Sequence, residues 1–275
     1  MNKSSSLVIR ASRGWRGIDW KELIHYRDLL WFLTVRGIKA KYAQSVLGVA
    51  WAVIQPLFST LVFTVVFGTL ARIDSNGVPY FLFSLVALVP WTFFANTLTD
   101  SANSLVSNAN MITKVYFPRL VLPLSSILSK GVDFLISFAL VIVFLIVYRM
   151  LPSWHVVWLP WLLVVLLMTS LGIGMILSAM AVQYRDVKHA MVFAVQLIMY
   201  AAPVVYPTTN VPEGWRSVYA LNPMVGVIEG FRSIFLHTLP FPYGWVAQGT
   251  LVATALFVFG LFYFRKMERV FADVA

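Results

Sequence analysis

Few side chains in this sequence could carry out covalent chemistry, and their spacing does not bring them together. The four histidines, at positions 25, 155, 189 and 237, lie in four different segments, and there is no H-E-x-x-H pattern. A metal-dependent hydrolase or a nucleophilic triad needs such groups in one cluster. The sequence also lacks cysteine and a G-x-x-x-x-G-K-[ST] loop that could hold ATP phosphates. We therefore predict no catalytic residue, metal or cofactor in this chain; any ATP and Mg²⁺ would be bound by a separate subunit.

Two charged pairs occur at helical spacing inside apolar stretches, Lys130 with Asp133 and Glu229 with Arg232. At positions i and i+3 of a helix the two charged groups of a pair can meet. For Lys130 and Asp133 we favour a pair whose charges neutralise each other. A proton or ion relay, and a contact with substrate or with a second copy, are the alternatives. Glu229 and Arg232 are expected to pair and stabilise their helix, and with Asn222 they are candidates for an external gate.

The composition predicts an integral membrane protein. Of the 275 residues, 60% are hydrophobic and only 12% are charged, whereas a soluble domain carries roughly 25% charged residues. The formal charge of +10 would suggest a nucleic-acid partner in a soluble protein. Here the basic residues lie mostly between apolar runs, so they indicate membrane topology, and we expect no nucleic-acid partner.

Six apolar runs are long enough to cross the membrane as helices, which need ~20 residues each. They are continuously apolar rather than alternating, which favours helices over a barrel. We therefore predict an all-α membrane protein with six transmembrane helices. The runs lie near residues 47–70, 80–99, 121–148, 156–182, 189–206 and 245–264.

The distribution of lysine and arginine predicts the orientation. Segments 1–46, 104–119, 183–188 and 265–275 hold nine, two, two and three of these residues, whereas the opposite loops hold four in all. Positive residues favour the cytoplasmic side, so both termini are expected inside a bacterial inner membrane. The predicted organisation is a cytoplasmic tail (1–26), an interface helix (27–46), a six-span domain (47–264) and a second cytoplasmic tail (265–275).

Between the last two spans, residues 207–244 form an external segment that is too long for a simple connection and too apolar for a solvated one. Within it, Val225 to His237 has apolar residues at helical spacing but would span only about 20 Å as a helix. We predict short re-entrant helices here, with Asn222–Pro223 as the turn and helix start.

Before the first span, residues 27–46 are predicted to form an amphipathic helix that lies in the membrane interface. Trp31, Val35, Ile38, Tyr42 and Val46 fall on one stripe of a helical projection, with Arg36 and Lys39 on one flank and Lys41 on the other. Such a helix places its apolar face among the acyl chains and its cations near headgroup phosphates. The cations are either a simple membrane anchor or a contact for a substrate or partner; Arg36, Lys39, Lys41 and Tyr42 are our candidates for substrate loading.

Aromatic and polar residues inside the spans are candidates for a conduit. Trp51 and Gln55 are about one turn apart on a face that is unusual against lipid, and Tyr200 and Tyr206 lie in the fifth span. Most aromatics in such positions, among them Trp91, Phe93 and Phe94, are expected to form interfacial belts. Stacking on sugar rings is the alternative.

Two internal segments could dock on a soluble partner. The sequence QYRDVKH contains Arg185, Asp186 and Lys188, and the segment from Asn108 to Arg119 contains Lys114. Charged residues in a short loop can be held by complementary charges of a partner. An ordinary charged loop is the alternative.

The sequence resembles the membrane subunits of polysaccharide and polyol-phosphate ABC exporters, which include O-antigen, capsule and teichoic-acid permeases. The resemblance is carried, in order, by RDLLWFLTVRGIKAKYAQSVLGVAWAVIQP (27–56), NANMITKVYFPRLVLPLSSIL (108–128), VQYRDVKHAMVFAVQ (182–196) and APVVYPTTNVPEGWRSVYALNPMVGVIEGFRSIFL (202–236). It covers Arg27 to the C-terminus.

The resemblance implies a homodimeric permease bound to two copies of a separate ATPase. It also implies a glycan cargo carried on an undecaprenyl diphosphate lipid and exported across the inner membrane. From the residues alone, an ion-coupled secondary transporter or channel that acts without an ATPase is the alternative. A glycan-modifying membrane enzyme would need a carboxylate or histidine cluster that the sequence does not contain.

Overall fold

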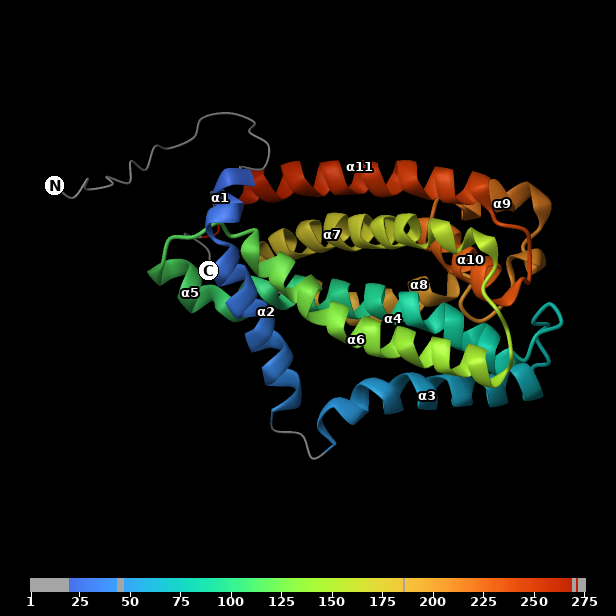
Figure 1. Ribbon diagram of the computed structural model, residues 1–275. Coiled ribbons are helices and arrows are strands. Elements are labelled where there is room, and N and C mark those ends of the chain that lie inside the picture. The colour runs from blue at the N-terminus through green and yellow to red at the C-terminus, as the bar shows by residue number, and fades with distance from the viewer. Residues whose placement is uncertain (1–19, 44–46, 185, 269–270, 272–275) are drawn as a thin grey trace.

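The computed structural model describes residues 20–43, 47–184, 186–268 and 271, and within these ranges the chain is helical with no strand. Five segments are long and apolar enough to cross a membrane, and they run alongside one another between two ends of the molecule (Figure 1). The first, Gly48–Leu70, contains α3 (Trp51–Phe63) and a π-helical turn (Thr64–Leu70). The others are α4 (Tyr80–Ser104), α6 (Val121–Val147), Trp154–Gln183 with α7 (Leu159–Gln183), and α11 (Tyr243–Met267).

These five segments coincide with five of the six predicted apolar runs. The remaining run, 189–206, is represented by α8 (Val187–Tyr200), which has 14 residues and is therefore only about 21 Å long. Turns follow α8 as far as Tyr206. The all-helical membrane fold is confirmed, while a sixth complete crossing stays a prediction, because a helix needs about 20 residues to span the hydrocarbon core.

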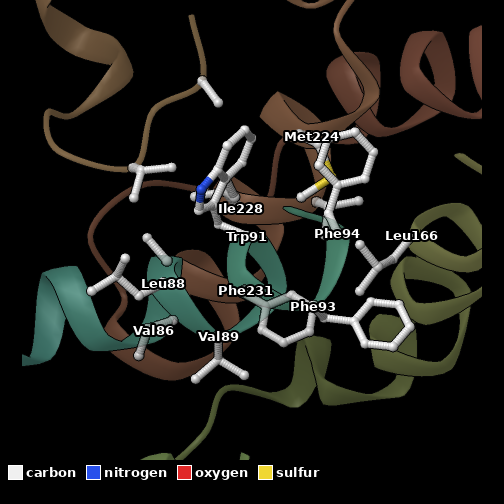
Figure 2. Close-up of a cluster of buried hydrophobic side chains, with 14 of the residues drawn as sticks. Val86, Leu88, Val89, Trp91, Phe93, Phe94, Leu166, Met224, Ile228 and Phe231 are labelled. Carbon is white, nitrogen blue, oxygen red and sulfur yellow. The ribbon is translucent and has the colours of Figure 1, made fainter. Parts of the chain in front are cut away.

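The helix α4 forms the centre of the bundle. Its most apolar stretch is 78% buried, against 11% for the corresponding stretch of the first segment, and it contacts α6, α7, α8 and α10. Side chains of α4 pack against Leu166 of α7 and against α10 (Figure 2). Trp91, Phe93 and Phe94 are buried in this core, so the expectation that they belong to an interfacial aromatic belt is wrong. In sequence, a core helix and a lipid-facing helix are equally apolar.

The helices α7 and α11 approach so closely that their backbones touch. A Cβ atom at Gly260 would lie 2.3 Å from the carbonyl oxygen of Gly172, and one at Gly172 would lie 2.7 Å from the backbone of Leu256. Small residues allow such close contact between membrane helices, where packing rather than the hydrophobic effect drives association.

The segment predicted to be external contains the two short helices α9 (Glu213–Tyr219) and α10 (Pro223–Leu236). The side chain of Asn222 caps α10 by accepting a hydrogen bond from the Met224 N–H, Pro223 follows as the first helical residue, and all 14 residues of α10 are buried. His237, with a φ of 55°, ends the helix in the left-handed conformation. The predicted helix start at Asn222–Pro223 is confirmed.

Candidate functional site

The predicted interface helix is observed as α2 (Arg27–Tyr42), which follows the short helix α1 (Trp20–His25) inside the segment expected to be a tail. It packs on α6 with Leu33 buried, whereas Trp31 is 69% exposed. A Cβ atom at Gly37 would lie 3.3 Å from the side chain of Ser129, so this glycine allows close packing on α6. The last residue of the predicted stripe, Val46, lies outside the described residues.

Two of the predicted loading cations bind polar side chains of neighbouring elements. The Arg36 guanidinium donates a 2.6 Å hydrogen bond to the side-chain oxygen of Asn108. The Lys41 ammonium lies 2.5 Å from the carboxylate of Asp133, which also accepts a hydrogen bond from the Tyr42 hydroxyl. Lys39 lies on the outer side of α2, in a groove beside Phe32 and Val35, and it has no ion-pair partner in the part of the chain that is described.

The helical projection grouped Arg36 with Lys39 and set Lys41 apart, but the structure brings Arg36 and Lys41 into one pocket between α2, α4 and α6. A projection shows which residues share a face of one helix. It does not show which neighbouring elements that face meets, and here α6 and the short turn after α4, which ends at Asn108, supply polar partners to α2.

The predicted pair of Lys130 with Asp133 does not form. Lys130 instead lies 2.7 Å from the carboxylate of Asp100 at the end of α4, and Asp133 binds Lys41 of α2. The two residues are one turn apart on α6, but α6 lies between α2 and α4, so each finds an opposite charge on a different neighbour. The pair that local spacing predicted is replaced by two ion pairs between helices.

These contacts define what we term the α2–α6 cluster. It surrounds a hollow of about 280 Å³ that is also lined by the serines of α4 and α6 facing α2. Three cations and two carboxylates leave a formal charge of +1. The side chains of Lys41 and Asp133 are 34% and 16% exposed, so the site is open to water. The cluster consists of Arg36, Lys41, Tyr42, Asp100, Asn108, Lys130 and Asp133.

Tyr42 is held in its neutral form. Burial, together with the hydrogen bond to Asp133 and the negative charge of that carboxylate, raises the pKa of its hydroxyl. The phenol therefore stays a hydrogen-bond donor throughout the physiological range, and it helps to fix the Asp133 carboxylate between α2 and α6.

The candidate docking residues lie at the end of the bundle that carries α2. Lys114 ends α5 (Ala109–Lys114) and is exposed, and α5 lies at this end of the bundle (Figure 1). Asp186 precedes α8 and is exposed, and Lys188 lies in its first turn and is half-buried. Arg185 lies outside the described residues. Docking of a partner on these segments stays a prediction.

The candidate conduit residues lie mostly on surfaces without a neighbour in the chain. Trp51 and Gln55 on α3 are exposed, as is Tyr200 at the end of α8. Tyr206 is half-buried, and its hydroxyl bonds to the carbonyl of Tyr200 and to the hydroxyl of Tyr219. A conduit role for these residues stays a prediction.

At the other end of the molecule, Glu229 and Arg232 form the predicted pair, 3.0 Å apart, with side chains 2% and 0% exposed. The Arg232 guanidinium also donates to the carbonyl oxygens of Val204 and Tyr206 and to that of Phe83 on α4. It lies over the Phe83 ring at 3.5 Å. We term these five residues the Arg232 cluster.

The Arg232 cluster satisfies backbone groups that have left a helix. Residues 201–206, after α8, form turns and bends, and buried backbone carbonyl groups in such a segment need hydrogen-bond partners. Arg232 binds two of them, the Tyr80 hydroxyl binds that of Val205, and the Asn222 amide binds that of Ala201. The cluster therefore holds the end of α8 against α4 and α10.

Two partners in the α2–α6 cluster were not predicted from the sequence, Asp100 and Asn108. Asp100 lies just after the predicted apolar run 80–99, but α4 continues to Ser104, which places the Asp100 carboxylate on the bundle. The signal that could have found it is the polar run after Thr97. A charge one turn beyond an apolar helix can still face the helices beside it.

Comparison with known proteins gives one consistent result. The family described as ABC-2 type transporter matches residues 28–236. The O-antigen export system permease protein RfbA of Klebsiella pneumoniae is 32% identical over 249 residues, covering 90% of this chain and 95% of that protein. The protein of the same name from Myxococcus xanthus is 35% identical over 223 residues, covering 80% and 85%. The polysialic acid transport protein KpsM of Escherichia coli is 22% identical over 224 residues, covering 79% and 82%.

Proposed function

Because the chain belongs to the ABC-2 type transporter family, we propose that it is the membrane permease of an ATP-driven exporter that moves a polysaccharide out of a bacterial cell. The similarity to two O-antigen export permeases over most of both chains carries this proposal. The cargo is an O-antigen-like glycan on an undecaprenyl diphosphate lipid, or a teichoic-acid-like polymer. The protein is a multi-pass membrane protein, with both termini in the cytoplasm.

The conduit is formed by two copies of the chain. The first segment, which contains α3, is exposed over most of its length in a single copy, and large apolar residues such as Phe58 and Phe193 lie on the free faces of α3 and α8. Contiguous apolar surface of this kind marks an interface with protein or lipid. Placing α3 of one copy near α8 of the other would bring Trp51, Gln55 and Tyr200 to the lining of a shared passage.

The energy comes from two copies of a separate ATPase. The sequence contains no phosphate-binding loop, so nucleotide must act through contact with a partner. The helix α5 and the connection between α7 and α8 carry the exposed residues Lys114 and Asp186 at the end of the bundle that we place in the cytoplasm. Movement of these segments when the ATPase binds and hydrolyses ATP would shift the permease between closed and open states.

Loading takes place at α2. The exposed cation Lys39 and the outer face of α2 attract the diphosphate of the lipid carrier, as polybasic segments attract anionic headgroups. Arg36 then exchanges the neutral amide oxygen of Asn108 for a charged phosphate oxygen, which is a stronger acceptor, and Lys41 exchanges the Asp133 carboxylate for a second phosphate oxygen. Release of Lys41 from Asp133 frees the end of α2 from α6.

The proposal is tested by reversing charge on α2. The variants Arg36→Glu and Lys41→Glu should abolish surface polysaccharide in a cell that lacks its own permease, while membrane insertion and co-purification with the ATPase stay intact. Arg27→Glu is the matched control, because Arg27 lies on the same helix with its side chain 77% exposed. Asp133→Asn breaks the same ion pair as Lys41→Glu but keeps the cation, and it should retain export. Normal export by Lys41→Glu would discard the loading role.

The alternative from another class is an ion-coupled transporter that acts alone. It predicts that purified protein in vesicles moves cargo without the ATPase, and that collapse of the proton gradient at constant ATP stops transport. The proposed function predicts the reverse of both results. Affinity purification followed by mass spectrometry of the bound proteins and lipids would identify the ATPase and the carrier together.

A further inference from the structure

A hollow of about 310 Å³ opens where α10 meets the beginning of α11, and none of the roles described above uses it. Ligand sites in proteins begin at about this size, ~300 Å³. Its lining combines the carboxylate of Glu229 and the hydroxyl side chain of Thr208 with the ring of Trp245 and the prolines of the 237–242 connection. It lies at the end of the bundle opposite α2 (Figure 1).

The polar residues that line the hollow are buried in the protein. Glu229 is 2% exposed, and its ion pair with Arg232 fixes the position of its side chain beside the hollow. Thr208 is buried beside that carboxylate, but its hydroxyl reaches no partner with hydrogen-bond geometry in the described part of the chain. A buried hydroxyl without a partner is uncommon in native proteins, and it offers a hydrogen bond to a ligand.

The apolar lining is also fixed. The backbone of Trp245 lies so close to α10 that a Cβ atom at Gly226 would come within 2.8 Å of the Trp245 carbonyl oxygen. This close packing sets the position of Trp245 at the start of α11. The ring is half-buried at the edge of the hollow, where an aromatic side chain can present an apolar surface to a ligand while its indole N–H remains a donor.

The charges of the hollow give little net attraction for an anionic ligand. The cation in the lining, Arg216, has contacts with Glu213 at 3.5 Å and with the carbonyl oxygen of Val211 at 3.0 Å. The Glu229 carboxylate is balanced by Arg232 and accepts hydrogen bonds. A buried acceptor, a hydroxyl and an aromatic surface together suit a neutral ligand that carries several hydroxyl groups.

We propose that this hollow binds one neutral sugar residue of the exported chain, with Trp245 against the ring of the sugar and Glu229 and Thr208 bonded to its hydroxyl groups. The assignment to exported cargo rests on the proposed function, and it places a glycan contact outside the passage between α3 and α8. A site at this end would hold the chain after it leaves the membrane and oppose its return.

The test measures binding directly, in full-length protein reconstituted into phosphatidylcholine nanodiscs, since sugar-based detergents would compete. Saturation-transfer NMR is recorded with the methyl glycosides of mannose, galactose and glucose, and with inorganic phosphate by ³¹P line broadening. At least one glycoside should show transfer. The variant Trp245→Ala removes the aromatic face and should weaken the affinity for this glycoside by about fivefold to tenfold. The variant Trp245→Phe should restore most of the affinity. The variant Thr208→Val should weaken the affinity by about threefold. Phosphate should not bind at this site.

Trp215→Ala is the matched control, because Trp215 lies on α9 at the same end of the bundle, is 66% exposed and does not line the hollow. Absence of transfer for all three glycosides, equal transfer in Trp245→Ala, or phosphate binding that Trp245→Ala abolishes would each overturn the inference. Complementation of a permease-deficient cell separates the two proposals. Normal export without glycoside binding sinks this inference alone, whereas glycoside binding without any complementation removes the assignment to exported cargo.

Discussion

The two ends of the molecule carry ion-pair clusters of opposite character. In the Arg232 cluster both charges are almost completely buried, and the guanidinium serves three backbone carbonyl groups besides its carboxylate. In the α2–α6 cluster the charges are partly exposed, and Lys41 and Lys130 each bind one carboxylate from a different helix. A buried pair is costly to break because it leaves an unpaired charge, whereas a hydrated pair can exchange partners at little cost.

This difference in burial indicates that the two clusters have different roles. The Arg232 cluster satisfies carbonyl groups of a segment of turns and bends, so breaking it would be costly; a gating role for Asn222, Glu229 and Arg232 stays a prediction. The α2–α6 cluster joins an interface helix to the bundle through contacts that an anion or a change in ionic strength can replace. Of the two, the α2–α6 cluster is therefore the one that can change its contacts during a transport cycle.

The largest effect is expected from Arg232→Met. This change leaves the buried Glu229 carboxylate and the carbonyl groups of Val204 and Tyr206 without a partner, which should cost about 3–5 kcal/mol of folding free energy. Fluorescence-detected size-exclusion chromatography after a temperature series should show little folded protein. Arg216→Met removes a less buried pair at the same end and should cost less than about 1 kcal/mol. Similar losses in both variants would contradict the contrast between buried and exposed pairs.

A smaller effect is expected from Asp133→Asn, the corresponding change in the α2–α6 cluster. It weakens the contacts of Lys41 and Tyr42 with α6, but water can hydrate the released ammonium group, so the cost should be about 1–2 kcal/mol. The freed Lys41 should bind phosphate more tightly than in the wild-type protein, measured by ³¹P line broadening in nanodiscs. A loss of stability as large as that of Arg232→Met would mean that both clusters are permanent.

Tyr42→Phe should cost about 1 kcal/mol at neutral pH through the lost hydrogen bond to Asp133. It should also change the pH dependence. Because the folded state raises the pKa of Tyr42 above its ordinary value of 10.0, its contribution to stability is complete below pH 10 and is lost as the pH rises further. The decrease in melting temperature between pH 9 and pH 11 should be smaller in Tyr42→Phe than in the wild-type protein. Equal decreases would show that the phenol is not held neutral by folding.

The smallest effect is expected for the pair of Lys130 with Asp100, whose carboxylate is 42% exposed. A double-mutant cycle with Lys130→Gln and Asp100→Asn should give a coupling energy of about 0.5 kcal/mol, and this should fall as NaCl rises from 0.05 to 0.5 M. The equivalent cycle for Glu229 and Arg232 should show no such dependence on salt. A salt-independent coupling between Lys130 and Asp100 would remove the distinction between the two ends.

The sequence predicted the Arg232 cluster better than the α2–α6 cluster. The reason is the separation in sequence of the residues that contact each other. The pairing of Glu229 with Arg232 and the start of α10 at Asn222–Pro223 depend on residues within one turn of each other, and both were predicted. The apolar runs also located the long helices, because lipid requires about 20 apolar residues whatever the neighbours are.

Contacts between helices could not be predicted from the spacing of residues along the sequence. Local spacing paired Lys130 with Asp133, but the position of α6 between α2 and α4 gave each residue a partner 30 or more positions away. Burial was equally hidden, since α4 and α3 are similar in composition and differ in what surrounds them. Which partner an intramembrane charge meets depends on the order of the helices in space, and one sequence contains no direct record of that order.

The contact between Gly172 and Gly260 limits how the permease can move. Two backbones that touch without side chains between them cannot rotate about their axes or slide past each other, since any neighbouring residue brought to that point would carry a Cβ atom into a carbonyl group. The helices α7 and α11 must then move together as one rigid unit. Any widening of the proposed passage is then left to α3 and α8, of which few residues are buried in a single copy.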